Sequence, residues 1–248
     1  MGLGVSRIEP LERTEQVVFW ALEAGYRHID TAKLYKNEAY VGSAVHKSGI
    51  PREDIWITTK LWPADFHHPR KALEASLRRL NMDYVDLYLV HWPTPVGMPG
   101  FERRLWRAME ALVESGLCKT IGVSNYQMGR LQRVLSIANT PPAVNQVRCS
   151  PFNYPSDLHN FCREHGIALE GYGPLTQGSK LDDQTITMMA EKYHKSVAQI
   201  LLRWALQKDI IVIPKTQSKE RIHENIALYD FVLADDDIRI LDSLAVSL

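Results

Sequence analysis

The chain has 248 residues, of which 45% are hydrophobic and 23% charged, the ordinary balance of a globular protein. Basic and acidic residues number 29 each, so the basic excess typical of nucleic-acid-binding proteins is missing. No apolar run approaches the ~20 residues that cross a bilayer, and the first residues lack the pattern of a secretory leader. We therefore expect a cytoplasmic protein with neither nucleic-acid nor membrane partners.

The pattern of elements is an alternation of short apolar runs with amphipathic stretches of helical period. The runs that predict strands are 3–5, 27–30, 55–60, 85–91, 120–124, 143–146, 168–172 and 210–214. The stretches that predict helices are 15–23 (capped by Thr14), 37–47, 69–80, 101–115, 128–137, 156–165, 185–194, 197–207 and 220–228. Eight such repeats predict a parallel α/β protein, and they favour a closed (β/α)8 barrel of one domain, 1–248, over a doubly wound sheet.

Polar side chains collect where these strands are predicted to end. In a (β/α)8 barrel the carboxyl ends of all strands surround one mouth, where active sites lie. Polar residues in register at seven strand ends therefore predict one site rather than scattered loop starts. The residues concerned are Asp30, Lys60, His91, Ser124, Asn125, Gln146, Tyr172 and Lys215.

Four residue types near this mouth suit the delivery of a proton to an oxyanion. A free tyrosine is a poor acid, with a pKa near ~10, but the ammonium of Lys60 should lower the pKa of Tyr35 by stabilising the phenolate. Asp30 would keep that lysine charged and oriented. His91 would polarise a carbonyl oxygen by donating a hydrogen bond. A hydride donor would complete this chemistry, which requires a bound nicotinamide.

Each of these residues also has an ordinary structural reading. Alone, Asp30 would cap a turn, Lys60 would be a solvated lysine, His91 a core histidine and Tyr35 a surface tyrosine. All of these readings would have to hold together to exclude a site. No metal is expected, because the histidines at 67 and 68 lack a third ligand and the three cysteines follow no zinc-binding spacing.

Six segments carry a resemblance to a known family. They are GYRHIDTAKLYKNE, ITTKLW, YLVHWP, IGVSN, VNQ and VIPKTQSKERIHEN, in this order, and they resemble the signatures of the aldo-keto reductases from about residue 25 to 242. The resemblance implies a catalytic tetrad of Asp30, Tyr35, Lys60 and His91, with Tyr35 as proton donor. It further implies that Trp92 walls the oxyanion pocket and that Trp62 lines the substrate side.

The same resemblance implies a nicotinamide cofactor lying across the barrel mouth. No GxGxxG motif follows a predicted strand, so the sequence does not support a Rossmann half-domain. Ser124, Asn125 and Gln146 would hold its carboxamide, and Tyr172 would stack on its ring. Lys215, Thr216 and Arg221 precede or open a helix and suit a ribose 2′-phosphate, which favours NADPH over NADH. Family members also reach the adenine from the positions of Glu224 and Asn225.

The expected function is the NADPH-dependent reduction of aldehydes or ketones to alcohols by a monomer, with a small carbonyl compound as its partner. The alternative is an NADPH-binding regulatory or structural subunit with little turnover; an isomerase is a more distant possibility. Compared with the family pattern, we expect no N-terminal hairpin under the barrel and no long C-terminal tail. An open substrate pocket of broad specificity would follow from these differences.

Overall fold

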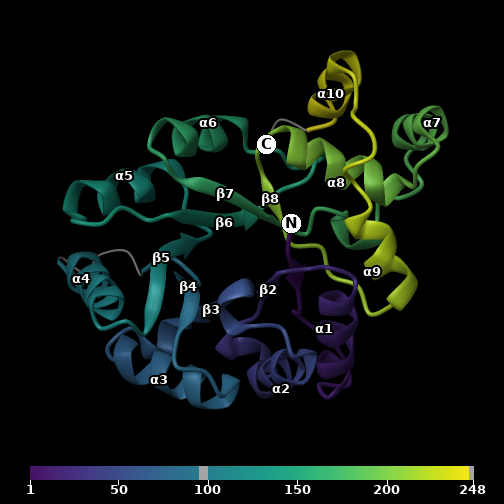
Figure 1. Cartoon of the computed structure of the whole chain (residues 1–248). Helices are drawn as coiled ribbons and strands as arrows, with labels where there is room; N and C mark the ends of the chain where they lie inside the picture. The colour runs from purple at the N-terminus through teal and green to yellow at the C-terminus, as the bar shows by residue number, and fades with distance from the viewer. Residues whose placement is uncertain (95–99, 246–248) are drawn as a thin grey trace.

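The protein is described by a computed structural model over residues 1–94 and 100–245. Its eight strands are all parallel, and each pairs with the strand that follows it along the chain. Figure 1 shows the strands inside and the helices around them. The strands are β1 (Leu3–Gly4), β2 (His28–Asp30), β3 (Trp56–Leu61), β4 (Val85–Val90), β5 (Cys118–Ser124), β6 (Val144–Arg148), β7 (Ala168–Tyr172) and β8 (Ile211–Val212).

The first and last strands meet, which closes the sheet on itself. The backbone N–H of Gly2 donates to the carbonyl oxygen of Val212 at 2.8 Å, and that of Gly4 donates to Pro214 at 3.1 Å. A Cβ on Gly4 would lie 2.8 Å from the carbonyl oxygen of Ile213, so the close approach at this seam requires glycine. The predicted (β/α)8 barrel is confirmed.

Ten α-helices among the described residues cover the outside of the barrel. They are α1 (Arg13–Glu23), α2 (Glu38–Ser48), α3 (Pro69–Leu80), α4 (Phe101–Glu114), α5 (Met128–Ile137), α6 (Ser156–Glu164), α7 (Gln184–Tyr193), α8 (Val197–Gln207), α9 (Lys219–Ile226) and α10 (Asp235–Asp242). Short 3₁₀ turns lie at η1 (Lys33–Tyr35), η2 (Arg52–Asp54), η3 (Pro63–Asp65) and η4 (Thr176–Gly178). In residues 1–94 and 100–245, no helix is both long and apolar enough to span a bilayer.

The predicted helices occur where expected, with two differences. Thr14 is not a cap: α1 begins at Arg13, and the buried hydroxyl of Thr14 accepts a hydrogen bond from the Asn37 side chain at 3.4 Å. The helix α10 was not predicted, because three consecutive aspartates begin it and only Asp237 and Leu241 are buried. The expected lack of a C-terminal tail concerns the end of the chain, and residues 246–248 lie outside the described residues.

The interior of the barrel is apolar toward one end and polar toward the mouth. Leu87, Leu89 and Val144 form an interior cluster against which Ala168 packs. Because side chains two residues apart on a strand share a face, Gln146 follows Val144 on the interior, and Glu170 follows Ala168. The polar layer above the cluster therefore arises from strand alternation, and it forms the floor of the site described next.

Candidate active site

A buried ion pair lies at the carboxyl ends of β2 and β3. The Nζ atom of Lys60 donates to both carboxylate oxygens of Asp30 at 2.7 Å and to the carbonyl oxygen of Thr31 at 2.9 Å. Lys60 has no exposed surface, and Asp30 is 2% exposed. Burial alone would lower the pKa of Lys60, but the Asp30 carboxylate and Tyr35 outweigh it and raise that pKa. The lysine is therefore a fixed positive charge.

Tyr35 ends the turn η1, where its ring lies over this charge. The Nζ atom of Lys60 is 5.1 Å from the centroid of the Tyr35 ring. Burial raises the pKa of Tyr35, and the opposing effect of Lys60 does not reverse this shift. The expectation of a lowered pKa is therefore wrong for the net direction, although Lys60 acts with the expected sign. At neutral pH the phenol carries its proton and is able to donate it.

His91 follows β4 directly and faces the same group. Its ring is edge-on to the Tyr35 ring, with centroids 5.8 Å apart, and to the Trp62 ring at 5.3 Å. Burial, with a further contribution from Lys60, lowers the pKa of His91 to about 3, so the imidazole is neutral at physiological pH. Its Nδ1 atom is buried and has no hydrogen-bond partner in the part of the chain that the structure describes. An uncharged ring tolerates such a buried atom without a partner better than a charged one would, in keeping with the lowered pKa.

Hydroxyl and amide groups continue the site along β5 and β7. Asn125 adopts a left-handed backbone conformation (φ 65°) after β5. Its Nδ2 atom donates to the carbonyl oxygen of His91 at 3.1 Å, and its Oδ1 atom accepts from the Tyr172 hydroxyl at 2.9 Å. The Ser124 hydroxyl donates to the carbonyl oxygen of Gln146 at 2.9 Å. These residues form one connected layer beside His91.

Gln146 links this layer to the ion pair and to a residue that the sequence analysis missed. Its Nε2 atom donates to Asp30 at 2.7 Å and to Glu170 at 2.6 Å. Burial, followed by the nearby Asp30 charge, raises the pKa of Glu170 to about 8. A sequence signal existed, since an acidic residue in an apolar run shares the face of Tyr172 two positions later. The interior therefore holds two carboxyl groups, not one.

The remaining predicted cofactor residues lie apart, around the start of α9. The strand β8 ends at Val212, so Lys215 lies in the loop beyond it rather than at the strand end. Ser218 caps α9 by accepting from the Arg221 N–H at 3.2 Å. Lys215 and Arg221 are exposed and form no ion pair with any other described residue. The segment offers two cations and a helix N-terminus, a combination suited to an anion.

Three other predicted residues have distinct surroundings. Thr216 and Asn225 are buried near the cations, at 8% and 3% exposure. Glu224 accepts a hydrogen bond from the Ser196 hydroxyl at the start of α8, so one of its oxygens is already engaged. Of the two tryptophans, Trp62 contacts His91, whereas Trp92 is 45% exposed and has no ring contact with His91 among the described residues.

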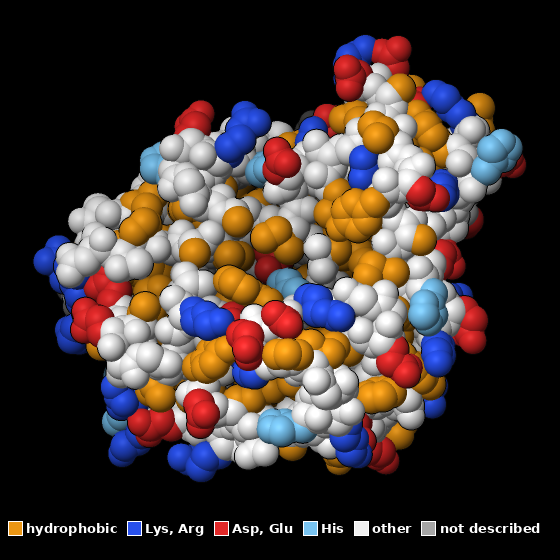
Figure 2. Space-filling model, viewed as in Figure 1, with side chains coloured by type: hydrophobic (Ala, Val, Ile, Leu, Met, Phe, Trp, Pro, Cys, Tyr) orange, Lys and Arg blue, Asp and Glu red, His pale blue; other side chains and the backbone are white. Residues whose placement is uncertain are grey.

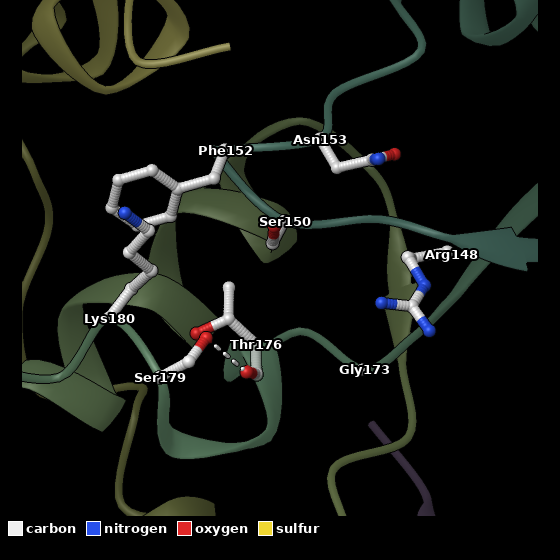
Figure 3. A pocket seen from close by; sticks show the side chains of 8 residues that line it. All are labelled: Arg148, Ser150, Phe152, Asn153, Gly173, Thr176, Ser179 and Lys180. Atoms are coloured by element: carbon white, nitrogen blue, oxygen red, sulfur yellow. Dashed lines mark hydrogen bonds between the residues drawn. The ribbon is translucent and has the colours of Figure 1, made fainter. Parts of the chain in front are cut away.

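A cavity of about 190 Å³ opens between the ends of β6 and β7. Figure 3 shows Arg148 on one side, Lys180 beside Phe152 on the other, and the Ser150 and Thr176 side chains between them. The Arg148 guanidinium lies 5.9 Å from the centroid of the Tyr172 ring, which links the cavity to the site. Its cations and hydroxyls were also missed by the sequence analysis, and they suit an anionic group.

The tetrad residues therefore converge, while the predicted residues of α9 lie on a helix that packs against α1 and α8. Figure 2 shows this face hollowed near its centre, with an acidic and a histidine side chain visible inside. Over residues 1–94 and 100–245, no group of three or more His, Cys, Asp or Glu side chains could hold a metal ion. The chemistry available is a protonated phenol over a lysine, beside a neutral imidazole.

Comparisons with known proteins find relatives that align with nearly the whole chain. The glyoxal reductase of Bacillus subtilis (strain 168) is 43% identical over 98% of this chain and 87% of its own. The methylglyoxal reductase DkgA of Yersinia pestis is 42% identical over 98% of this chain and 88% of its own.

Solved structures share the fold of this chain. An aldo/keto reductase from Brucella melitensis has a TM-score of 0.92 at 43% identity, covering 98% of this chain and 93% of that one. An aldo-keto reductase from Bombyx mori, solved in complex with NADP, has a TM-score of 0.92 at 35% identity, covering 99% and 88%. The model of the aldo/keto reductase family matches residues 1–246. The chain belongs to the aldo/keto reductase family.

Proposed function

We propose that this chain reduces small aldehydes and ketones to alcohols with NADPH, with Tyr35 as the proton donor. The observation that carries the proposal is the buried Lys60–Asp30 pair beneath the ring of a protonated Tyr35, beside a neutral His91. The names of the glyoxal and methylglyoxal reductases support short dicarbonyl compounds as the first substrates to test.

The proton comes from Tyr35. As negative charge develops on the carbonyl oxygen, the phenol donates its proton to that oxygen. The ammonium of Lys60 stabilises the phenolate left behind, and Asp30 holds the ammonium in place through two hydrogen bonds of 2.7 Å. Because neither charge has to move, the electrostatic environment is prepared before the reaction.

His91 polarises the carbonyl group without supplying a proton of its own. With its pKa lowered to about 3, the imidazole is neutral and has one N–H to donate. A neutral donor binds the carbonyl oxygen and leaves Tyr35 as the acid. Trp62, in edge contact with the imidazole, restricts its orientation.

The residues around the mouth fit a nicotinamide nucleotide. When bound, NADPH supplies the hydride that attacks the carbonyl carbon. Ser124, Asn125 and Gln146 would hold its carboxamide, and Tyr172 would stack on its ring. The cavity with Arg148 and Lys180 would face its phosphates. The 2′-phosphate and adenine would lie against residues in or just before α9.

The residues expected to contact the 2′-phosphate and adenine are Lys215, Thr216, Arg221, Glu224 and Asn225. Their exposed cations and buried amide support NADPH over NADH, since a 2′-phosphate adds charge that a 2′-hydroxyl lacks. No step of the proton transfer depends on this end of the site, so its contribution is to affinity.

The experiment that tests the proposal is the oxidation of NADPH in the presence of glyoxal, methylglyoxal and a set of longer aldehydes and ketones, run beside NADH. We expect substrate-dependent oxidation that is faster with NADPH at equal low concentration. Binding of NADPH without oxidation of any substrate would contradict the proposal and support a regulatory or structural subunit instead.

A further inference from the structure

The side-chain amide of Gln146 is held between two carboxyl groups. Its Nε2 atom lies 2.7 Å from Oδ2 of Asp30 and 2.6 Å from Oε1 of Glu170. All three side chains are buried, with exposed fractions of 3%, 2% and 1% for Gln146, Asp30 and Glu170. These contacts bring together β2, β6 and β7, which no local sequence signal joins.

This arrangement fixes which end of the amide remains available. A glutamine amide has two N–H donors and one oxygen acceptor, and here both donors are directed at carboxyl oxygens. Rotation of the amide by half a turn would place its oxygen against the Asp30 carboxylate, whose charge is held by Lys60, and two acceptor oxygens facing each other are unfavourable. The Oε1 atom receives no hydrogen bond from the described residues, and it is not among the polar atoms buried without a partner. It is therefore the free acceptor of this side chain.

Asp30 alone does not fix the amide to the same degree. Its oxygens already accept two hydrogen bonds from Lys60, so it is oriented by the lysine as well as by Gln146. Without Glu170, one N–H of the amide would lose its acceptor inside the barrel and would turn toward whichever acceptor the mouth offers. The second carboxyl group is what occupies the second N–H.

We propose that Glu170 is a positioning residue that locks the Gln146 amide so that its oxygen faces a primary amide donor in the bound ligand. This inference rests on the proposed function, in which that donor is the carboxamide of the nicotinamide. Glu170 itself touches neither cofactor nor substrate. Its effect is to make Gln146 an acceptor in the site and never a donor.

A cofactor analogue isolates this effect. In the 3-acetylpyridine analogue of NADP⁺ a methyl group replaces the carboxamide NH2, so the analogue offers no N–H to Gln146 but keeps the phosphates and adenine. We expect the unaltered chain to bind NADP⁺ about fivefold more tightly than the analogue, the size of one hydrogen bond. Binding would be measured by quenching of protein fluorescence.

The variants Glu170→Leu and Glu170→Ala remove the second acceptor, one keeping volume and one leaving room for water. In both we expect the ratio of the two dissociation constants to fall toward one, because the freed amide accommodates either ligand. If one of them does not fold, by circular dichroism, the other serves for the test. Glu170→Gln retains an acceptor oxygen and should restore most of the ratio.

The matched control is Glu110→Gln. Glu110 is a buried carboxylate on α4 that accepts the backbone N–H groups of Asn139 and Thr140 at 2.7 and 2.8 Å, remote from the mouth in sequence and role. Its loss should lower stability and leave the ratio unchanged. A purely structural role for Glu170 would weaken both ligands equally and keep the ratio, which would overturn the inference.

The outcomes separate this inference from the proposed function. If the unaltered chain binds neither NADP⁺ nor the analogue, the proposed function is overturned together with the inference. If it binds both equally well, or if Glu170→Leu keeps the full ratio, the inference alone is overturned. A ratio that collapses in the truncations and returns in Glu170→Gln supports it.

Discussion

Burial raises the pKa of the Tyr35 phenol, whereas the nearby ammonium of Lys60 acts to lower it. These two effects have different consequences. Burial keeps the proton on the oxygen in the resting protein, while Lys60 lowers the energy of the phenolate once the proton has left. We expect Tyr35→Phe to lower kcat by about 100-fold or more, since general acid catalysis typically contributes that much. The dissociation constant of NADPH should stay within about twofold.

Tyr40→Phe is the matched control for this substitution. Tyr40 is a half-buried tyrosine of α2, and its loss of one hydroxyl should leave kcat unchanged. Equal losses of turnover and of NADPH binding in Tyr35→Phe would contradict the proton-donor role.

Two histidines with lowered pKa values predict sensitivity to acid. Burial lowers the pKa of both His28 and His91 to about 3, from an ordinary value of 6.5. Between these values the unfolded chain binds protons that the folded chain does not, so stability falls as pH decreases from about 6.5 toward 3. Each histidine contributes at most on the order of 1 kcal/mol per pH unit in this window.

We therefore expect His91→Gln to flatten the loss of unfolding free energy between pH 6 and pH 4, measured by urea denaturation at several pH values. His67 is an exposed histidine on the loop before α3, and His67→Gln should leave the slope unchanged. An unaltered slope in His91→Gln would show that His91 does not titrate in this window.

At the scale of elements, we expect the segment from β8 to α9 to distinguish NADPH from NADH. Lys215 and Arg221 are exposed cations without ion pairs among the described residues, so a 2′-phosphate would meet them at little desolvation cost. We expect Lys215→Ala and Arg221→Ala each to raise the KM for NADPH by about tenfold, as for a lost hydrogen bond to a charged group. The KM for NADH and kcat should change little.

Lys219→Ala is the control on the same helix. Lys219 lies in the first turn of α9, and its Nζ atom is 3.8 Å from Glu23 on α1, a surface pair worth little. Equal effects of Lys215→Ala on NADPH and NADH would remove the argument that this segment selects the phosphate.

The elements show which parts of the fold the sequence predicts. Strand β4 is read from its apolar run because burial on both sides leaves it only one charged position. The helix α10 was missed because its acidic first turn hides a narrow apolar face. Thr14 looked like a cap because its residue type is typical of one, but the folded chain uses its hydroxyl to accept from Asn37. Residue type alone does not show whether a threonine hydroxyl caps a helix or accepts a hydrogen bond from a distant side chain.

For the site, the rule that strand ends converge places Asp30, Lys60 and His91 correctly. The hydrogen bonds of Gln146 to Asp30 and Glu170 could not be read in this way, because they depend on the register between β6 and β7 and on a contact across the barrel to β2. Likewise, the net pKa direction of Tyr35 depends on how deeply the turn η1 is buried. Long-range register and burial are properties of the folded chain.

At the scale of the whole molecule, the seam between β1 and β8 is a point of tight packing. A Cβ on Gly4 would lie 2.8 Å from the backbone oxygen of Ile213, which no side-chain movement relieves. We expect Gly4→Ala to lower the free energy of unfolding by about 1–3 kcal/mol, as for other overpacked positions, measured by urea denaturation.

Gly129 provides the opposite case in the same chain. It lies in α5, and a Cβ there would meet nothing within 4 Å, so Gly129→Ala should be neutral or stabilise by about 0.5–1 kcal/mol. Tolerance of Gly4→Ala without loss of stability would mean that the seam has room to separate.

The seam also sets an order of events for a chain emerging from the ribosome. It joins residues 2 and 4 to residues 212 and 214, so the barrel stays open through nearly the whole of translation. The closed barrel, inside which Asp30 and Lys60 are buried, can therefore be completed only after the last strand has been synthesised.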